Sequence, residues 1–437
     1  MGEVLKIAEA LWRGDTDVYA HHPFGPPYGL ESIEEGISFI KGFANTIVLE
    51  TQEGLVIVDP GGSVDYRKKY EAIRKATDSP LHTAIYTHGH IDHVFGVSLF
   101  VAEEAARPNI IAHRLLPGRL QRYIRTNGWN SAINGRQFRG GAGSVRWPDQ
   151  FDYPTLTYAD RLNITVGGQE IRIRHTRGET DDHSWVYLPG SGVLCTGDLF
   201  IYAIPNAGNP QKVQRYAAEW ASGLEEMAAL APNVLLPGHG FPIIGADRVR
   251  EALLNTAQLL EYLDARTVAL MNEGATLDLI LHEVRMPEEL SGLAYLQPVY
   301  DDPEFIVRNI YRLYGGWYDG IPSHLKPAPE AAQAREIAAL AGGAKRLAER
   351  AEKIVDEGDC RLACHLADWA VQAAPDDESV RAAAGRVYMA RIEIEPSTMA
   401  FGLFTSAARS YGASMETERL KKGHLIMAQV QRGQLKK

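Results

Sequence analysis

Short apolar runs of strand length alternate with segments of helical spacing from about residue 40 to residue 245. The runs Asn45–Glu50 and Leu55–Asp59 are separated by the turn-type segment Thr51–Gly54, which predicts a β-hairpin. Further strands are predicted at Leu81–Thr87, Asn109–His113, Asn163–Val166, Glu170–His175, Trp185–Leu188 and Val193–Thr196, with a helix at Tyr66–Thr77. Strands that alternate with helices in this way favour a layered α/β architecture.

The pattern changes from about residue 247 onward, where strand signals fade. After Glu330, apolar residues recur almost everywhere at helical spacing. Amphipathic helices are predicted at Leu347–Gly358, Cys360–Ala374 and Ser379–Ile394, and a linker at Gly320–Pro329. We therefore predict an irregular N-terminal lead-in over residues 1–39, an α/β catalytic domain over residues 40–265, and an all-helical domain over residues 266–437.

Composition narrows the classes of function. The chain has 437 residues, with 45 Lys and Arg against 55 Asp and Glu, so its formal net charge is −10. Nucleic-acid binding depends on basic surface that neutralises phosphates, so we expect no nucleic-acid partner. Three cysteines are too few for a disulfide framework. No apolar run reaches the length of about 18 residues that a membrane span requires, and the start has no signal-type run, so we expect a cytoplasmic protein that does not bind membranes.

The densest chemical signal is the segment His88-Gly89-His90-Ile91-Asp92-His93. His88 and His90 lie two residues apart on a predicted extended backbone, so their side chains point to the same side. Asp92 and His93 follow at the predicted turn into a helix, where they can face a second centre. Because imidazole and carboxylate groups are the ligands of zinc and similar divalent metals, the segment predicts a metal site.

Three further candidate ligands stand beside predicted strands. His183 comes just before a strand, whereas Asp198 and His239 each follow one, next to glycines. Open α/β sheets place their sites in loops at strand ends. We therefore add these three residues to the predicted metal site.

Together, HGHIDH and the downstream His, GD and PGHG resemble the metallo-β-lactamase superfamily, whose signature is H-x-H-x-D-H. The resemblance covers about residues 40–245 and includes Asp59, which matches an earlier strand-end aspartate of that family. It implies an αββα sandwich with the metals at one edge, followed here by the all-helical domain.

By position, the resemblance implies two metal ions. The first would be held by His88, His90 and His183, the second by Asp92, His93 and His239, with Asp198 bridging both. A hydroxide between the ions would be the nucleophile, since paired cations lower the pKa of a bound water. Asp92 and Asp198 are therefore expected to act in catalysis. Zinc is the first expectation, although iron and manganese accept the same ligands.

A second resemblance covers about residues 290–412. Leu313–Pro322 and the helices from Glu357 to Gly412 are similar to the segment after the catalytic domain and to the helical dimerisation domain of the alkylsulfatase group. The similarity implies a homodimer through the C-terminal helices. The group places glutamates where this chain has His183 and Asp198. We expect that the sterol-carrier-like C-terminal domain usual in that group is absent.

An anionic substrate needs cationic or amide donors beside the metals. Arg136 lies in the Gly- and Asn-rich segment Asn127–Trp147, which predicts a long functional loop. The loop after Asp198 is punctuated by Gly and Pro. We predict substrate-binding roles for Arg136, Asn206, Lys212 and Arg215.

The leading hypothesis is a dinuclear metal hydrolase that cleaves an ester-type bond of a small molecule, as an alkylsulfatase-like sulfuric ester hydrolase. One alternative of the same fold is a lactone, thioester or carboxylic ester hydrolase, because His183 and Asp198 are the commoner ligands in the wider superfamily. An alternative from another class is a helical partner-binding scaffold with a vestigial metal site. The presence of all seven predicted ligands argues against that reading.

Overall fold

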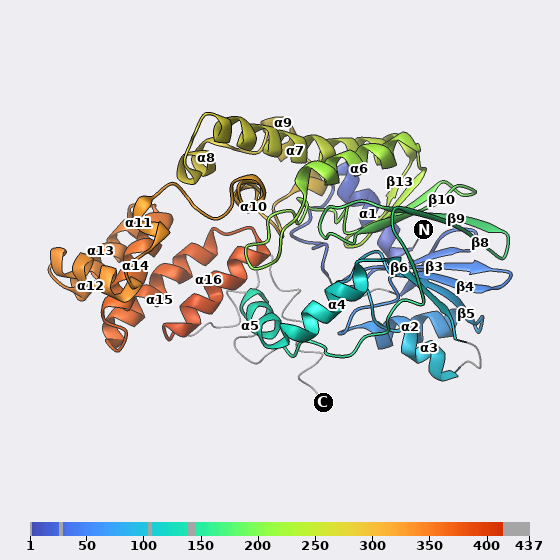
Figure 1. Ribbon diagram of the computed structural model, residues 1–437, viewed down its shortest axis with the longest axis horizontal. Coiled ribbons are helices and arrows are strands. Elements are labelled where there is room, and N and C mark those ends of the chain that lie inside the picture. Colours follow the sequence, from blue (N-terminus) through green and yellow to red (C-terminus); the bar gives the residue numbers. More distant parts are fainter. Residues whose placement is uncertain (1, 26–28, 104–106, 139–144, 414–437) are drawn as a thin grey trace. The chain divides into compact units, whose positions relative to one another are not determined.

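The computed structural model describes residues 2–25, 29–103, 107–138 and 145–413. In these ranges the chain divides into two units (Figure 1). The sheet unit contains residues 2–130 and 147–315. The helical unit contains residues 131–138, 145–146 and 316–413.

Two β-sheets form the centre of the sheet unit. The seven-stranded sheet runs in chain order through β1 (Leu30–Glu34), β2 (Ile37–Ile40), β3 (Thr46–Thr51), β4 (Gly54–Val58), β5 (Leu81–Ile85), β6 (Asn109–His113) and β7 (Leu156–Tyr158). The six-stranded sheet has the order β13 (Ile243–Ile244), β12 (Val234–Pro237), β11 (Val193–Gly197), β10 (Ser184–Leu188), β9 (Gln169–His175) and β8 (Arg161–Val166). Most central strand positions are fully buried, as continuous apolar runs predict.

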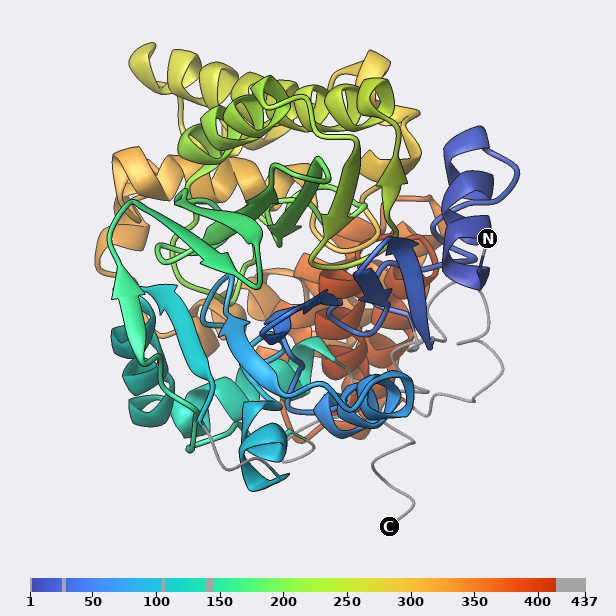
Figure 2. The same ribbon diagram turned by 90° about the vertical axis from the view of Figure 1, so that its right-hand side faces the viewer.

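Helices cover the outer faces of both sheets. Besides the start of α5 (Asn127–Gln137), the helices of the sheet unit are α1 (Glu3–Arg13), α2 (Tyr66–Ala76), α3 (Val97–Glu103), α4 (Leu116–Arg125), α6 (Ala217–Ala229), α7 (Ala246–Asn272), α8 (Leu277–Glu283), α9 (Glu288–Ser291), the 3-10 turn η1 (Ala294–Leu296) and α10 (Pro303–Gly315). Of these, α8 and α10 pack on α7. Figure 2 shows the sheets face to face, with α6 and α7 over one sheet and α2 and α3 over the other. The predicted αββα sandwich is confirmed.

Two pairs of parallel strands determine where the site lies. β4 pairs with β5, and β11 pairs with β12, each in parallel register. The carboxyl ends of paired parallel strands meet at one sheet edge. Asp59 and the segment from His88 follow the first pair, while Asp198 and His239 follow the second. Candidate ligands that are far apart in sequence are thereby gathered.

The lead-in is more ordered than predicted. It contains α1, β1 and β2 in place of irregular chain. Val4, Ala8 and Leu11 are buried at helical spacing along α1, and the Trp12 ring stacks on Tyr295 with 5.5 Å between centroids. The prediction gave too much weight to the prolines from Pro23 onward, which come after the helix.

The segment predicted as a long loop after Asn127 instead contains a helix, α5 (Asn127–Gln137). Its Gly and Asn content gives weak helix propensity, but burial of Ile133 and Asn134 overrides that propensity. Within the helical unit the end of α5 approaches Gly402 so closely that a Cβ there would lie 1.7 Å from the Gln137 carbonyl oxygen. Tertiary packing therefore orders a segment whose sequence indicates a loop.

The division of the chain also falls later than predicted. α7 continues through the predicted boundary at residues 265 and 266, and the sheet unit extends to residue 315. α10 belongs to the sheet unit because it buries Ile306, Val307 and Ile310 and packs on α7. The prediction that the chain is helical after residue 247 is correct for the described residues. A run of helices does not by itself define a separate unit, however.

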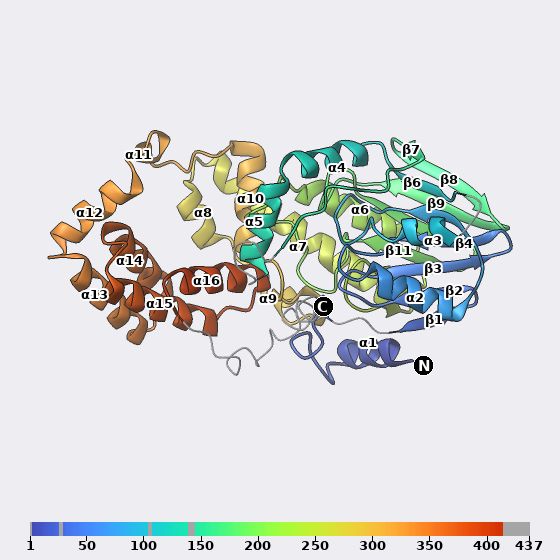
Figure 3. The same ribbon diagram turned by 90° about the horizontal axis from the view of Figure 1, so that it is seen from below.

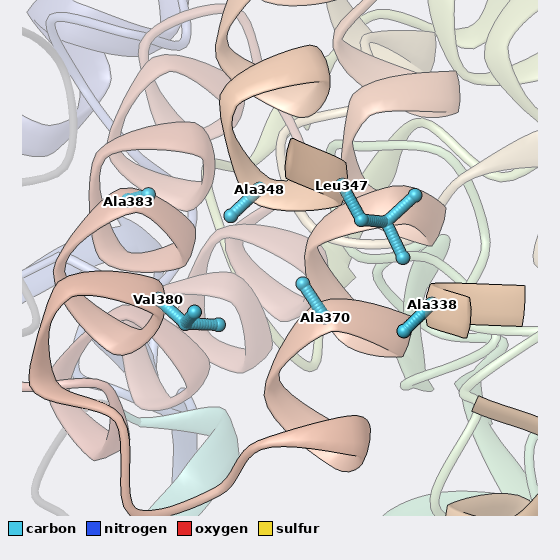
Figure 4. Close-up of a cluster of buried hydrophobic side chains, with 6 residues drawn as sticks. All are labelled: Ala338, Leu347, Ala348, Ala370, Val380 and Ala383. Atoms are coloured by element: carbon cyan, nitrogen blue, oxygen red, sulfur yellow. The ribbon is translucent and has the colours of Figure 1, made fainter. Parts of the chain in front are cut away.

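The helical unit is built from antiparallel neighbours (Figure 3). Besides most of α5 it contains α11 (Pro322–Leu325), α12 (Glu330–Leu340), α13 (Ala344–Asp356), α14 (Cys360–Ala373), α15 (Glu378–Glu393) and α16 (Thr398–Ser410). One core cluster consists of Ala338, Leu347, Ala348, Ala370, Val380 and Ala383 (Figure 4). Because four of these six side chains are alanine, the helices can approach one another closely.

None of the helices in the described ranges is long and apolar enough to cross a membrane.

Candidate metal centre

Seven side chains at the strand ends form two groups of potential metal ligands. The first ligand group consists of His88, His90, Glu179 and Asp198, and the second of Asp92, His93 and His239. In each group, one ligand atom per residue lies within 4.8 Å of every other. Nitrogen and carboxylate oxygen donors of this kind suit zinc and similar divalent ions.

In the first ligand group, three ring and carboxylate atoms converge. His88 Nε2 and His90 Nδ1 are 2.9 Å apart, and Glu179 Oε2 lies 3.3 Å from the former and 3.0 Å from the latter. The His88 ring and the Glu179 carboxylate are fully buried, while His90 is partly exposed. These three donor atoms lie close enough together to bind one metal ion.

In the second ligand group, Asp92 Oδ2 lies 3.6 Å from His93 Nε2 and 3.5 Å from His239 Nε2. Asp198 lies between the two groups. Its Oδ1 is 3.3 Å from His93 Nε2, and its Oδ2 is 3.2 Å from His239 Nε2 and 3.7 Å from His88 Nε2. This is the place predicted for a bridging carboxylate.

The unmatched polar atoms fit the presence of cations. Among the described residues, Glu179 Oε2, His93 Nε2 and Asp198 Oδ1 are buried and have no hydrogen-bond partner. Burying such atoms without partners is costly. Because all three point into the two ligand groups, divalent ions would satisfy them.

Each imidazole of the second ligand group is oriented through its far nitrogen. His93 Nδ1 lies 2.8 Å from Asp59 Oδ2, and His239 Nδ1 donates a short hydrogen bond to the Phe43 carbonyl oxygen. Asp59 is held in turn by the backbone N–H and the hydroxyl of Thr87, at 2.8 and 2.7 Å. These contacts fix the rings so that both Nε2 atoms face the centre.

Glu179 is a member of the first ligand group that the sequence analysis missed. Its Oε1 accepts hydrogen bonds from Asn206 Nδ2 at 2.5 Å and from an Arg215 guanidinium nitrogen at 3.2 Å. Burial opposes ionisation, but the charges of His90 and Arg215 lower the pKa of Glu179 to about 2. One indication of this role lies in the sequence, where Glu179 comes four residues before the predicted ligand His183.

His183, predicted as a ligand of the first metal, lies behind the group instead. Its Nε2 accepts the backbone N–H of Asp198 at 3.0 Å, and its ring stacks on His88 with 4.5 Å between centroids. Burial lowers the pKa of His183 to about 4, which keeps this nitrogen available as an acceptor. Because its Nε2 is already engaged, His183 positions Asp198, and Glu179 stands where His183 was expected.

The predicted substrate-binding residues have separate locations. Asn206 and Arg215 are buried and bind Glu179, so they support a candidate ligand. Lys212 is half-buried, with its Nζ 5.2 Å from the centroid of a Trp147 ring. Burial and the Arg215 charge lower the pKa of Lys212 to about 7, against the opposing charges of Asp92 and Glu179. Arg136 is exposed on α5 in the helical unit.

Electrostatics separate the two ligand groups. Burial, and to a smaller extent the neighbouring His93, lower the pKa of His88 well below its usual value. For His93, burial also opposes protonation, but the charges of Asp198, Asp92 and Asp59 outweigh it and raise the pKa well above the usual value. The three carboxylates near His93 therefore favour a positive charge on this imidazole more than on His88.

Comparisons with known families match both parts of the chain. Residues 40–239 match the metallo-β-lactamase superfamily, and residues 276–413 match the alkyl sulfatase dimerisation family. A linear primary-alkylsulfatase from Pseudomonas sp. is 32% identical over 356 residues, which are 76% of this chain and 67% of that protein. An (R)-specific secondary-alkylsulfatase from Pseudomonas sp. is 28% identical, over 81% of this chain and 58% of the relative.

A solved structure gives the same result for the fold. The chain superimposes on the stereoselective inverting sec-alkylsulfatase Pisa1 from Pseudomonas sp. with a TM-score of 0.80 and 24% identity, over 89% of this chain and 66% of that one. The chain spans 56–67% of the length of the four curated alkylsulfatases that it matches.

Proposed function

Because the chain belongs to the alkylsulfatase group of the metallo-β-lactamase superfamily, we propose that it is a metal-dependent hydrolase of sulfuric esters. The observation that carries the proposal is the pair of ligand groups joined through Asp198. A decayed site on a scaffold protein would have lost donors, whereas two groups of potential ligands are retained here, which supports the proposal.

We assign His88, His90 and Glu179 to a first zinc ion, Asp92, His93 and His239 to a second, and Asp198 to both. Zinc is proposed because imidazole nitrogen and carboxylate oxygen donors suit it. Two such ions would supply a water of lowered pKa and would polarise the ester. In the net reaction an alkyl sulfate and water give an alcohol and hydrogen sulfate.

The chain's own residues supply orientation and charge. Arg215 and Asn206 hold Oε1 of Glu179, so Oε2 is left to face the first centre. The Lys212 ammonium interacts electrostatically with Asp92 and Glu179, one from each ligand group, and we propose that it attracts the sulfate group. Its lowered pKa would also let it exchange a proton near neutral pH.

We further propose a homodimer formed through the helical unit. This unit carries exposed apolar side chains, including Leu340, Leu362 and Ile394, the first of them 89% exposed. A second copy would cover such surface. A mass of one chain in solution at micromolar concentration would count against the dimer.

The decisive test is sulfate release from a medium-chain alkyl sulfate by the zinc-loaded protein. Asp198→Asn should lower kcat by more than about 100-fold, because a ligand shared by two ions matters more than the outer partners whose loss costs about 10–100-fold. Exposed Arg125 on α4 gives the matched control, Arg125→Met, which should leave the rate unchanged.

No sulfate release from protein shown to hold two zinc ions would overturn the sulfate-ester proposal. Hydrolysis of a lactone, thioester or carboxylic ester by the same sample would then favour the acyl-ester alternative. Protein that binds no zinc at all would favour the scaffold reading.

A further inference from the structure

A buried ion-pair cluster lies behind the first ligand group, apart from the Arg215 support of Glu179. Arg119 comes from α4, and its side chain is 2% exposed. Its Nε is 2.9 Å from Asp182 Oδ1, and a terminal nitrogen makes a short contact with Asp181. Asp182 is fully buried, whereas Asp181 is 37% exposed. The two aspartates therefore hold Arg119 from the inside and from the rim.

The cluster reaches the metal-site segment through one hydrogen bond. The backbone N–H of Gly89, between His88 and His90, donates to Asp182 Oδ2 at 2.8 Å. Asp182 is three residues after Glu179 and directly before His183. One carboxylate thus ties the segment that carries two ligands of the first group to the segment that carries the third.

The packing at Gly89 is tight. A Cβ at this position would lie 2.7 Å from Arg119 Cδ and 3.1 Å from Asp182 Oδ2. The backbone of the His88–His90 segment therefore rests directly on the Arg119 side chain. A side chain at residue 89 would have to displace either the guanidinium arm or the segment itself.

Stability alone is a weak reason for such a cluster. Taking Arg119 and Asp182 out of water carries a desolvation penalty that a buried ion pair offsets only with good geometry. What the cluster does supply is a fixed separation between three segments: α4, the His88–His90 turn and residues 179–183. The histidines of the second ligand group are oriented by other residues, Asp59 and the Phe43 carbonyl.

We propose that Asp182 and Arg119 are positioning residues that set the geometry of the first metal centre and leave the second unaffected. The inference rests on the proposed metal binding. Its consequence is selective: losing the Asp182–Gly89 bond lets His88 and His90 move away from Glu179, so zinc affinity falls at one centre of the two.

The test is zinc titration of the full chain against a competing chelator, with stoichiometry and both affinities as readouts. Asp182→Ala should weaken one zinc site by about 10–100-fold, the usual effect of losing an outer partner, while the other site keeps its affinity. Asp181→Ala removes an Arg119 partner at the rim without touching Gly89, so both affinities should stay within twofold of wild type.

A conservative variant separates positioning from folding. Asp182→Asn can still offer its amide oxygen to Gly89 N–H, although its pairing with Arg119 is weakened. We expect it to unfold at lower temperature and yet bind zinc at both sites more tightly than Asp182→Ala. Equal loss of zinc in Asp182→Asn and Asp182→Ala, or unchanged binding in Asp182→Ala, would overturn the inference.

If Asp182→Ala fails to fold, Gly89→Ala serves as the second variant, since its Cβ displaces the same segment from Arg119. It should show the same loss of zinc affinity at one site. Unchanged zinc affinity at both sites would refute the positioning role of Asp182 and Arg119. Failure of the proposed function is distinguishable, because wild-type protein would then bind no zinc or release no sulfate.

Discussion

The two ligand groups face one another across Asp198, but the histidines of the second and the Glu179 carboxylate of the first are supported by opposite kinds of chemistry. The second ligand group is supported by acceptors: Asp59 and the Phe43 carbonyl each take the far N–H of a histidine. In the first ligand group the carboxylate of Glu179 is supported by donors, Asn206 and the Arg215 cation. An imidazole needs an acceptor behind it, whereas a carboxylate needs donors.

That difference changes how far the support extends through the chain. An acceptor can be a single backbone carbonyl, but a buried guanidinium must itself be held. Arg215 Nε donates to the Asn206 carbonyl oxygen at 2.6 Å, and Asn309 of α10 donates to the carbonyl oxygens of Ala207 and Arg215. The first ligand group therefore depends on α10, which lies within the segment matched to the dimerisation family.

The largest effect should come from removing the carboxylate ligand itself. Glu179→Gln loses the ligand charge and leaves Arg215 buried without its ion-pair partner. We expect zinc content to fall from two ions to one per chain and sulfate release to drop by more than about 100-fold. Metal analysis of gel-filtered protein measures the first quantity. Two tightly bound zinc ions in Glu179→Gln would show that Glu179 is not needed to hold the first ion.

The next largest effect is on stability. Arg215→Met removes the cation and leaves the Glu179 charge buried and unpaired. Breaking a buried pair in this way costs about 3–5 kcal/mol in the free energy of unfolding. Urea denaturation of the zinc-free protein measures the loss. A change below about 1 kcal/mol would mean that the cation does not support the first ligand group.

The matching change behind the second ligand group is Asp59→Asn, because Asp59 supports His93. The amide can still face His93, but the ring loses the charge that fixes its tautomer. We expect zinc affinity at one site to fall by about 10–100-fold, with little loss of stability compared with Arg215→Met. Chelator competition, with Asp152→Asn as the control, tests the expectation. Equal stability losses in both variants would remove the distinction between acceptor and donor support.

The smallest effect is a shift in pH dependence at the far end of the first group's support. Burial raises the pKa of Asp301 to about 7, although its carboxylate accepts the N–H groups of Asp302 and Gly208. Because the folded pKa lies above the unfolded value, this group's stability contribution is present below pH 4 and is lost as the pH rises towards 7. Asp301→Asn should flatten that decline in urea unfolding between pH 4 and 7. An unchanged slope would contradict it.

Several features were predictable from local sequence. The αββα sandwich follows from the strand and helix pattern together with HGHIDH, and six of the seven donors stand beside predicted strands. Glu179 was missed because His183 is the more familiar ligand type and lies four residues away. Both residues are buried and belong to one loop, so only the positions of their donor atoms show which of the two faces the centre.

Asn206 and Arg215 illustrate the same limit. Their sequence context, a polar loop after Asp198, is that of residues that meet a substrate. The fold instead buries them against Glu179, because α10 packs on their loop through Asn309. The two compact units divide later than the predicted boundary at residues 265 and 266, and residues 127–137 form a helix, for a related reason: helical packing, in α10 and α5, outweighed local composition. Residues 139–144 of the predicted loop lie outside the described residues.

The sequence by itself determined the kinds of donor, their spacing in HGHIDH and their positions at strand ends, because ligand chemistry and strand periodicity are local properties. Tertiary structure alone decided which donors share a centre and which residues support them. Those relations join residues from 27 positions apart, for Asn206 and Glu179, to 196 positions apart, for His239 and Phe43. No local pattern encodes how desolvation and packing choose between a ligand, a supporting residue and an exposed side chain.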